Sequence, residues 1–294
     1  MKIKHLFFSL SVLVVAASLI LTGCRKHKEK DDDTSGVQDN ALAEGSFNDI
    51  GQISDEASKG SVSSYKDISS VGILSACASV KFDTLNHADK DSITVTFGDA
   101  NGNNCLCNDN RYRRGKLYIE YTAGKHYWDS TADVTIRTAP TDNYFVNDNQ
   151  VKGTKNIHNN GHNSAHHLNW SINVNGTIVK ANGQGTLLWT SSRNREWISG
   201  EITPLNWTDD IYSITGSANG TSVAGNNFTA QIDASDPLIK KNNCWWISAG
   251  KFSFDPGNGK PVRYVDFGYS PNQSGSCDNW ASITINGNTY HKQF

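Results

Sequence analysis

The spacing of hydrophobic and polar positions changes twice along this chain. An apolar run at Leu6–Leu21, broken only by three serines, comes first, and an amphipathic stretch at Ala41–Ser58 follows it. From about Val71 onward, short runs rich in Val, Ile, Thr, Tyr and Trp alternate with Asn-Gly, Gly-Asn and Asp-Asn turns. The pattern therefore predicts a leader segment, one helix and a long β-region.

The β-region contains about ten expected strands with no helix between them. Parallel pairing needs crossovers of a dozen or more residues, so the short gaps favour antiparallel hairpins and meanders. We expect an all-β fold, either a sandwich or a curved, open half-barrel. The expected strands are Ser92–Phe97, Lys116–Tyr121, Asp133–Thr138, Leu168–Val174, Thr186–Thr190, Asp210–Thr215, Phe228–Ile232, Cys244–Phe254, Val262–Phe267 and Ala281–Ile285.

The amphipathic stretch predicts one short helix, even though it contains two glycines. Its apolar residues recur at roughly helical spacing, at Leu42, Phe47, Ile50 and Ile53. We expect residues 24–40 to be a charged tether, residues 41–70 to hold the helix and a Ser-rich linker, and residues 71–294 to form a single β-domain.

Residues 1–23 have the features of a lipoprotein signal peptide. Lys2 and Lys4 precede the apolar run, which is shorter than the roughly 20 residues needed to cross a bilayer. The Leu-Thr-Gly-Cys tetrapeptide that ends at Cys24 resembles a bacterial lipobox, in which the cysteine becomes the lipidated first residue. Several acyl chains such as palmitate on one residue hold a protein stably at a membrane. We therefore expect Cys24 to be lipidated.

The segment Arg25–Asp33 is a charged block that resembles the surface-export signal of Bacteroidota lipoproteins. The predicted location is the bacterial cell envelope, with a lipid anchor in the outer membrane. The charged block favours outward display over retention facing the periplasm.

Composition and charge exclude several classes of protein. Hydrophobic residues make up 37% and charged residues 19%, which argues against a disordered polyelectrolyte and a polytopic membrane protein. The net charge of −2 gives no positive field that would attract nucleic acid. The chain has no Gly-rich phosphate loop, and we expect no cofactor.

The two ends of the β-region share one pattern: a cysteine, a hairpin ending in Phe-Gly, a loop with a second cysteine and Asp-Asn, and a strand. The second copy predicts a disulfide between Cys244 and Cys277. In the first copy, Cys77 has two candidate partners, because spacing from Phe-Gly favours Cys107 and spacing to Asp-Asn favours Cys105, which we prefer. The remaining cysteine is expected to be inert. The repeat suggests equivalent first and last hairpins and, as a hypothesis, neighbouring ones.

Most of the region from Cys77 to the end resembles a family of Bacteroidota envelope lipoproteins with a Cys-containing β-domain. That family has no assigned chemistry, so the resemblance implies the compartment and the β-architecture and transfers no catalytic residues. The motifs that carry it are Ser-Ile-Thr-Val-Thr-Phe-Gly from Ser92, Asp-Asn-Arg-Tyr-Arg-Arg-Gly-Lys from Asp109, Asn-Tyr-Phe-Val-Asn-Asp-Asn from Asn143, Arg-Asn-Arg-Glu-Trp-Ile from Arg193 and Cys-Asp-Asn-Trp-Ala-Ser-Ile from Cys277.

Tryptophans and arginines are the candidate ligand-binding residues. Trp245 and Trp246 are adjacent in an expected strand, so one of them faces away from the core and can offer a flat platform to a sugar ring or a partner protein. Arg111 and Arg113 share a strand face and can clamp a carboxylate or phosphate. The favoured alternatives are core packing for each tryptophan and, for the arginines, a surface ladder paired with Glu120, Glu196 or Asp109. Others considered in these groups are Arg114, Arg193, Arg195, Trp189, Trp197, Trp207 and Trp280.

Two further clusters resemble metal sites, but neither fits. Four histidines, at 158, 162, 166 and 167, have helical spacing around an Asn-Asn-Gly that predicts a hairpin tip, where the spacing fixes no geometry. The segment Asp99–Asn103 has its glycine at position four of a calcium-like loop instead of six. We expect solvated turns and no metal.

The chain lacks the short motifs of hydrolases, such as Gly-x-Ser-x-Gly and His-Glu-x-x-His. We expect a non-catalytic β-protein that binds an extracellular ligand, glycan or protein partner. One alternative is a glycan-active enzyme with paired carboxylates. Another is a periplasmic structural or lipid-carrying module whose curved sheet shields an apolar groove.

Overall fold

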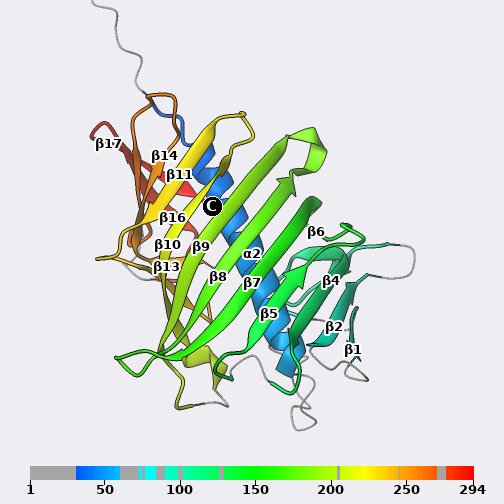
Figure 1. Ribbon diagram of the computed structural model, residues 1–294. Helices are drawn as coiled ribbons and strands as arrows, with labels where there is room; N and C mark the ends of the chain where they lie inside the picture. Colours follow the sequence, from blue (N-terminus) through cyan, green and yellow to red (C-terminus); the bar gives the residue numbers. More distant parts are fainter. Residues whose placement is uncertain are drawn as a thin grey trace, which may run out of the picture. The chain divides into compact units, whose positions relative to one another are not determined.

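The computed structural model describes residues 31–59, 73–74, 77–83, 90–98, 102–125, 129–203, 206–244, 246–269 and 276–294. Residues Asp33–Phe294 form one unit, in which the described segments contain one α-helix and seventeen strands of a single sheet (Figure 1). Every strand pairing is antiparallel. The predicted all-β antiparallel fold is confirmed.

The strands follow one another as a meander. The first nine are β1 (Ala78–Asp83), β2 (Lys90–Phe97), β3 (Cys105–Leu106), β4 (Tyr112–Thr122), β5 (Asp133–Arg137), β6 (Phe145–Val146), β7 (Asn149–His162), β8 (Leu168–Val179) and β9 (Thr186–Ser199). The remainder are β10 (Ile211–Thr221), β11 (Asn227–Ile232), β12 (Leu238–Lys241), β13 (Ile247–Ala249), β14 (Lys251–Asp255), β15 (Arg263–Asp266), β16 (Trp280–Ile285) and β17 (Asn288–Gln293).

Among the described strands, β1 pairs only with β2 and β17 pairs only with β16, so these two strands form the edges of an open sheet. The long strands β7, β8 and β9 lie at its centre, and α2 (Ser35–Lys59) crosses one face obliquely (Figure 1). A single open sheet around a helix corresponds to the curved alternative and not to a sandwich of two sheets.

All ten expected strands overlap observed ones, but the segment expected as one strand at Cys244–Phe254 is divided into β13 and β14. The division falls at Gly250, whose φ is +102° and where a Cβ atom would lie 2.2 Å from the Pro237 carbonyl oxygen. Only glycine tolerates that backbone and that approach. As a result, β13 pairs with β12 while β14 pairs with β11 and β15.

Strand β7 was not among the expected strands, although it is one of the longest. Its inward positions include Lys155, Asn159 and Gly161 beside Val151 and Ile157, and all five are buried. Polar and glycine residues at inward positions hide the apolar alternation that predicts a strand.

Helix α2 begins at Ser35, inside the segment expected to be a tether. The hydroxyl and amide of Ser35 donate to the carboxylate of Asp33, which caps the first turn. Val37 is fully buried, so the apolar face starts before the expected helix does. No described helix is both long enough and apolar enough to cross a membrane.

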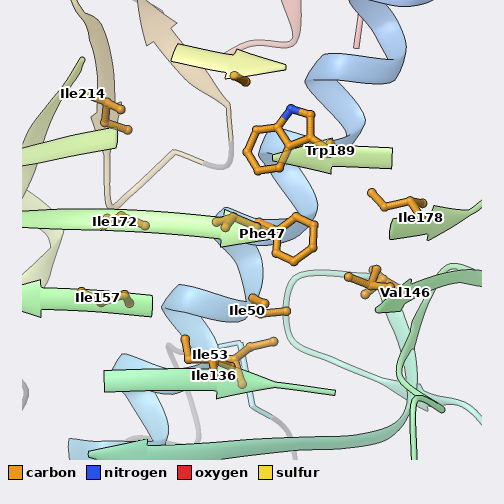
Figure 2. Packing of buried hydrophobic residues seen from close by; sticks show 14 of the residues in the cluster. Phe47, Ile50, Ile53, Ile136, Val146, Ile157, Ile172, Ile178, Trp189 and Ile214 are labelled. Atoms are coloured by element: carbon orange, nitrogen blue, oxygen red, sulfur yellow. The ribbon is translucent and has the colours of Figure 1, made fainter. Parts of the chain in front are cut away.

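The core lies between α2 and the sheet. Phe47 stacks on Trp189 with ring centroids 5.6 Å apart, and Ile50 and Ile53 lie beside it (Figure 2). A Cβ atom on Gly176 would be 2.0 Å from the Phe47 ring, so this glycine makes the space that the ring occupies. Phe47, Ile50 and Ile53 form the predicted apolar face, whereas Leu42 is only partly buried.

Both predicted disulfides are present. Cys244 is bonded to Cys277, and Cys77 is bonded to the preferred partner Cys105, while Cys107 is a buried free thiol. The repeat is also visible in the topology, because β1-β2-β4 and β14-β15-β16 are each three consecutive antiparallel strands. In the described sheet, no strand of one copy pairs with a strand of the other. The two copies also differ in position, because β1 is an edge strand and β14 is an interior one.

Candidate functional site

A row of hydrogen-bonded polar groups joins α2 to the sheet. Four polar residues on the buried side of the helix each contact a different residue of the sheet. We call these pairs the polar seam: Asp39 with Lys180 (3.2 Å), Asn40 with the Trp189 indole N–H (2.9 Å), Glu44 with Arg193 (2.7 Å) and Asp49 with Arg113 (2.6 Å). Buried polar groups that are paired in this way fix the rotation and register of the helix.

Arg113 is the most deeply buried member of the seam, with no exposed surface. Its guanidinium donates to the carboxylates of Asp49 and Asp109, and Arg111 lies 3.6 Å from Asp49. Burial acts to lower the pKa of Arg113, but the hydrogen bond to Asp109 and the charge of Asp49 raise it above its ordinary value. Asp109 was expected as a partner in a surface ladder. The pair of Arg113 and Asp109 is buried instead, because α2 covers it and supplies Asp49 as a second partner of Arg113.

Lys155 on β7 is a second buried cation beneath the helix. Its Nζ donates to the backbone carbonyl of Phe47 at 2.8 Å, next to Gly51. Burial and the positive charge of Arg195 lower its pKa to about 7, against the opposing influence of Glu44. Lys155 therefore loses its charge near neutral pH.

A cavity of about 360 Å³ lies between the first half of α2 and the C-terminal strands. The helix lines it with small and polar residues, including Gln38, Ala41, Gly45 and Asn48. The C-terminal segments contribute polar residues, among them Lys240, Asn279 and Gln293, and a group of apolar residues: Ile232, Leu238, Ile247, Phe252, Phe267 and Phe294. Phe267 packs against both Phe252 and Phe294, with centroids 5.9 and 5.8 Å apart, so three rings form a continuous surface. The cavity thus combines an apolar surface, largely from the C-terminal strands, with polar groups from the helix and from those strands.

Three carboxylates and three cations also line the cavity. Each carboxylate is engaged: Glu44 binds Arg193, Asp49 binds Arg113 and Arg111, and Asp278 accepts from the Ser276 hydroxyl and the Trp280 amide. The cations are Arg111, Arg193 and Lys240.

Lys240 is almost fully buried, and its Nζ donates to the backbone carbonyls of Lys241 and Cys244. Burial, followed by the charge of Arg111, lowers its pKa to about 8, while Asp49 opposes this change. The lining residue Arg111 precedes β4, and Lys240 lies on β12, so segments far apart in the sequence contribute to one cavity.

Two of the four candidate ligand-binding residues from the sequence, Arg111 and Trp246, line this cavity. Arg113 is occupied in the polar seam, and Trp245 lies outside the described residues. Sequence reasoning missed Glu44 and Lys240. Glu44 is one of the charged positions on the helix, and this was the available signal for it. No local pattern in the sequence indicates which strand lies opposite these positions.

Other tryptophans of the described chain pack in the interior. Trp170 and Trp189 are 2% and 1% exposed, and half-buried Trp197 contacts Trp170 and Tyr212 with centroids 6.3 and 5.8 Å apart. Core packing, the alternative considered for each tryptophan, describes these three. Trp246 lines the cavity.

The histidines at the end of β7 pair with carboxylates. His158 contacts Asp133 at 2.7 Å, His162 contacts Glu201 at 2.6 Å, and His167 contacts Glu196 at 2.7 Å. The hairpin tip lies after His162, because β7 continues to that residue. In the described segments no three such ligands gather as a metal site. Most of the calcium-like segment Asp99–Asn103 is outside them.

The chain matches no protein-family model, and no curated protein or solved structure is significantly similar to it.

Proposed function

We propose that this chain is a lipid-anchored binding protein of the bacterial envelope that holds a small amphipathic molecule in the cavity between α2 and the C-terminal strands. The observation that carries the proposal is a cavity that combines a surface of aromatic and aliphatic side chains with polar groups. It develops the ligand-binding hypothesis from the sequence, and it shares with the lipid-carrying alternative an apolar surface shielded by a curved sheet.

The dimensions and chemistry of the cavity support a small ligand. Ligand sites in proteins are typically cavities of roughly 300–1,000 Å³ with mostly apolar walls and a few placed polar groups. The volume of about 360 Å³ falls in the lower part of that range. The rings of Phe252, Phe267 and Phe294 suit an apolar chain, and the helix suits its polar end.

The engagement of the acids favours binding over acid–base catalysis. A glycosidase needs one carboxyl group as acid and another as base or nucleophile, both accessible to the sugar. Here Glu44 and Asp49 are paired with arginines, and Asp278 is held by a hydroxyl and an amide. These carboxylates serve the structure of the cavity wall.

Photolabelling tests the proposal. The purified lipidated protein, held in phosphatidylcholine nanodiscs, is exposed to palmitic acid carrying a diazirine on its chain. We expect labelled peptides that contain the cavity residues Leu238, Ile247 and Phe252. Ala41→Phe, which places a ring in the cavity from the helix side, reduces labelling by about tenfold, the equivalent of about 1.4 kcal/mol.

The matched control is Thr229→Phe, because Thr229 is exposed on β11 and faces away from the buried Ala230. This variant keeps wild-type labelling. Absence of label from the cavity peptides in the wild type, or equal labelling in Ala41→Phe, contradicts the proposed function.

The anchor part of the proposal rests on the signal peptide features and on Cys24. Cells that produce the chain incorporate labelled palmitate into it, and Cys24→Ser abolishes the incorporation. Protease added to intact cells then distinguishes the sides, because outward display predicts cleavage. Unlabelled wild-type protein overturns the anchor without affecting the cavity.

A further inference from the structure

The face of the sheet that points away from α2 carries rows of uncharged polar side chains on its central strands. In β7 and β8, buried residues such as Ile157 and Ile172 alternate with exposed polar ones, so the polar residues lie on the face opposite the helix (Figure 1). Residues that are directly paired across strands point to the same face. The pairings of β7–β11 therefore align a central row, which consists of Asn156, Asn173, Ser192, Ser217 and Gln231.

A second row runs beside the first, two residues away on each strand. It consists of Thr154, Asn175, Thr190, Asn219 and Thr229. Neither row contains a charged side chain, although charged residues make up 19% of the chain and favour exposed positions. Charge returns at the borders, where Thr154 pairs with Arg137 and Thr229 pairs with Asp255. We call these two rows the polar face.

The central row continues onto two further strands and reaches an aromatic side chain. Gln231 pairs with Ser253 on β14, and Ser253 pairs with Tyr264 on β15. Tyr264 is 62% exposed, so its ring is accessible on the same face. Adjacent strands are about 4.8 Å apart, which makes the row from Asn156 to Tyr264 about 29 Å long. The line of polar groups thus ends on a flat ring with an apolar body.

Hydrogen bonds along the polar face hold several of its side chains in place. The Thr190 hydroxyl donates to Oδ1 of Asn219 at 2.7 Å, and the Thr135 hydroxyl donates to Oδ1 of Asn156 at 3.0 Å. Each of these bonds uses the amide oxygen, and the amide nitrogen is a separate donor of two hydrogens. Side chains that are already ordered lose less entropy when a ligand binds.

The area and charge of the polar face restrict its ligand. Five strands about 4.8 Å apart and two rows about 6.8 Å apart give an area of about 330 Å². A stable dimer buries about 800 Å² on each partner, so the polar face is too small to hold a second copy of the chain. It offers no ion pair to a charged polymer, whereas its amides and hydroxyls both donate to and accept from hydroxyl groups. A long, uncharged and hydroxylated ligand suits these properties.

We infer that the polar face binds an uncharged, β-1,4-linked polysaccharide whose hydroxyl groups hydrogen-bond to the two rows and whose sugar ring stacks on Tyr264. A β-1,4-linked chain is an extended ribbon, and one sugar residue has nearly the length of one strand spacing. Successive sugars therefore meet successive strands. The inference is independent of the proposed function, because the polar face lies on the opposite side of the sheet from α2 and the cavity.

The experiment titrates the full chain, held in phosphatidylcholine nanodiscs, with cellohexaose, xylohexaose and mannohexaose in a calorimeter. We expect at least one of these uncharged β-1,4-linked sugars to bind with a Kd below about 1 mM. Hexamannuronate is the charged counterpart of mannohexaose, because it has the same linkage and a carboxylate on each ring. It binds at least about tenfold more weakly than the best neutral sugar, since its carboxylates find no cation on the polar face.

Two variants test the position of the sugar. Tyr264→Ala weakens binding by about tenfold, and its control Tyr112→Ala does not, because Tyr112 is 50% exposed on β4 and lies outside both rows. Asn173→Asp replaces the amide donor in the central row by a carboxylate of the same shape and also weakens binding by about tenfold. Asn182→Asp makes the same change in an exposed turn and keeps the wild-type affinity.

Four outcomes overturn the inference. Failure of all three neutral sugars to bind removes the ligand class, and equal binding of hexamannuronate removes the preference for an uncharged ligand. Wild-type affinity in both Tyr264→Ala and Asn173→Asp places the sugar elsewhere on the chain. In sedimentation velocity, a dimer that Asn173→Asp dissociates shows that a second copy occupies the polar face. None of these results changes the labelling of the cavity, which tests the proposed function separately.

Discussion

At the scale of the residue, the two glycines of α2 show how a position that weakens helix propensity can serve the tertiary structure. A Cβ atom on Gly51 would lie 2.8 Å from the Lys155 ammonium nitrogen, whereas a Cβ atom on Gly45 would have no neighbour within 4 Å. Gly51 therefore gives Lys155 access to the Phe47 carbonyl. Gly45 has no such role.

The two glycines make a matched pair for mutation. Gly45→Ala stabilises the protein by about 0.5–1 kcal/mol, because alanine loses less backbone entropy in a helix. Gly51→Ala gains the same propensity, but its methyl group displaces the Lys155 ammonium group and removes a buried hydrogen bond. Urea denaturation followed by circular dichroism measures both. Equal stabilisation by the two variants contradicts this account of Gly51.

The lowered pKa of Lys155 predicts a pH dependence of stability. Between the native pKa of about 7 and the ordinary value of 10.5, the unfolded chain binds a proton that the native protein does not. The free energy of unfolding therefore rises with pH across this window. Below this pH window, Lys155 is protonated in both the native and the unfolded state, so it no longer makes the free energy of unfolding depend on pH.

Lys155→Met reduces the increase of the free energy of unfolding with pH. The increase that remains comes from Lys240, whose pKa is about 8. Lys152→Met is the control, because Lys152 lies on the same strand and is only half-buried. Urea midpoints measured from pH 6 to pH 10 report the slope. An unchanged slope in Lys155→Met shows that the lysine is charged throughout.

At the scale of the element, α2 is held by apolar packing along one side and by the polar seam beside it. Phe47 fills the space over Gly176, and Arg113 fastens the middle of the helix through Asp49. The helix residues that line the cavity are mostly small or polar, and Leu42 is the large apolar exception. One helix thus forms a core and a cavity wall at the same time.

Arg113 and Arg114 are adjacent on β4 and point to opposite faces, which provides a direct test of the seam. Arg113→Met destabilises the protein by about 3–5 kcal/mol, because Asp49 and Asp109 keep buried charges without their partner. Arg114→Met costs at most about 1 kcal/mol, since exposed ion pairs contribute little. Thermal and urea unfolding compare the two, and similar losses contradict a special role for Arg113.

At the scale of the whole molecule, the open sheet has a disulfide in each copy of the repeated topology. Cys77–Cys105 joins the residue before β1 to the first residue of β3, and Cys244–Cys277 joins the segment before β13 to the segment before β16. Sequence separations of 28 and 33 residues make the two loops nearly equal. Each bond restricts the unfolded chain to a similar degree.

Removal of Cys244–Cys277 by a double serine substitution lowers the free energy of unfolding by about 4 kcal/mol in the chain-entropy model. Cys107→Ala leaves both disulfides intact, because Cys107 is a free thiol. Peptide mapping without reduction and urea denaturation check these outcomes. A Cys77–Cys107 peptide from the wild-type protein contradicts the observed pairing.

Local patterns in the sequence were enough for the class of fold, most strand positions, the apolar face at Phe47, Ile50 and Ile53, and the Cys244–Cys277 pair. These features depend on the period of the side chains and on residue spacing, which are local properties. The strand β7 was missed because its inward face carries Lys155, Asn159 and Gly161. The burial of Lys155 depends on a contact with the helix, where its ammonium group donates to the Phe47 carbonyl.

The site depended on contacts between residues far apart in the chain. Glu44 and Arg193 are 149 positions apart, and Arg111 shares a cavity with Lys240 only because the sheet curves around α2. No local spacing encodes which buried charge meets which partner, since that choice is made by the packing of elements. The sequence by itself determined the strands, the helix and the cysteines available for bonding. The tertiary structure alone decided which of their side chains enclose a cavity.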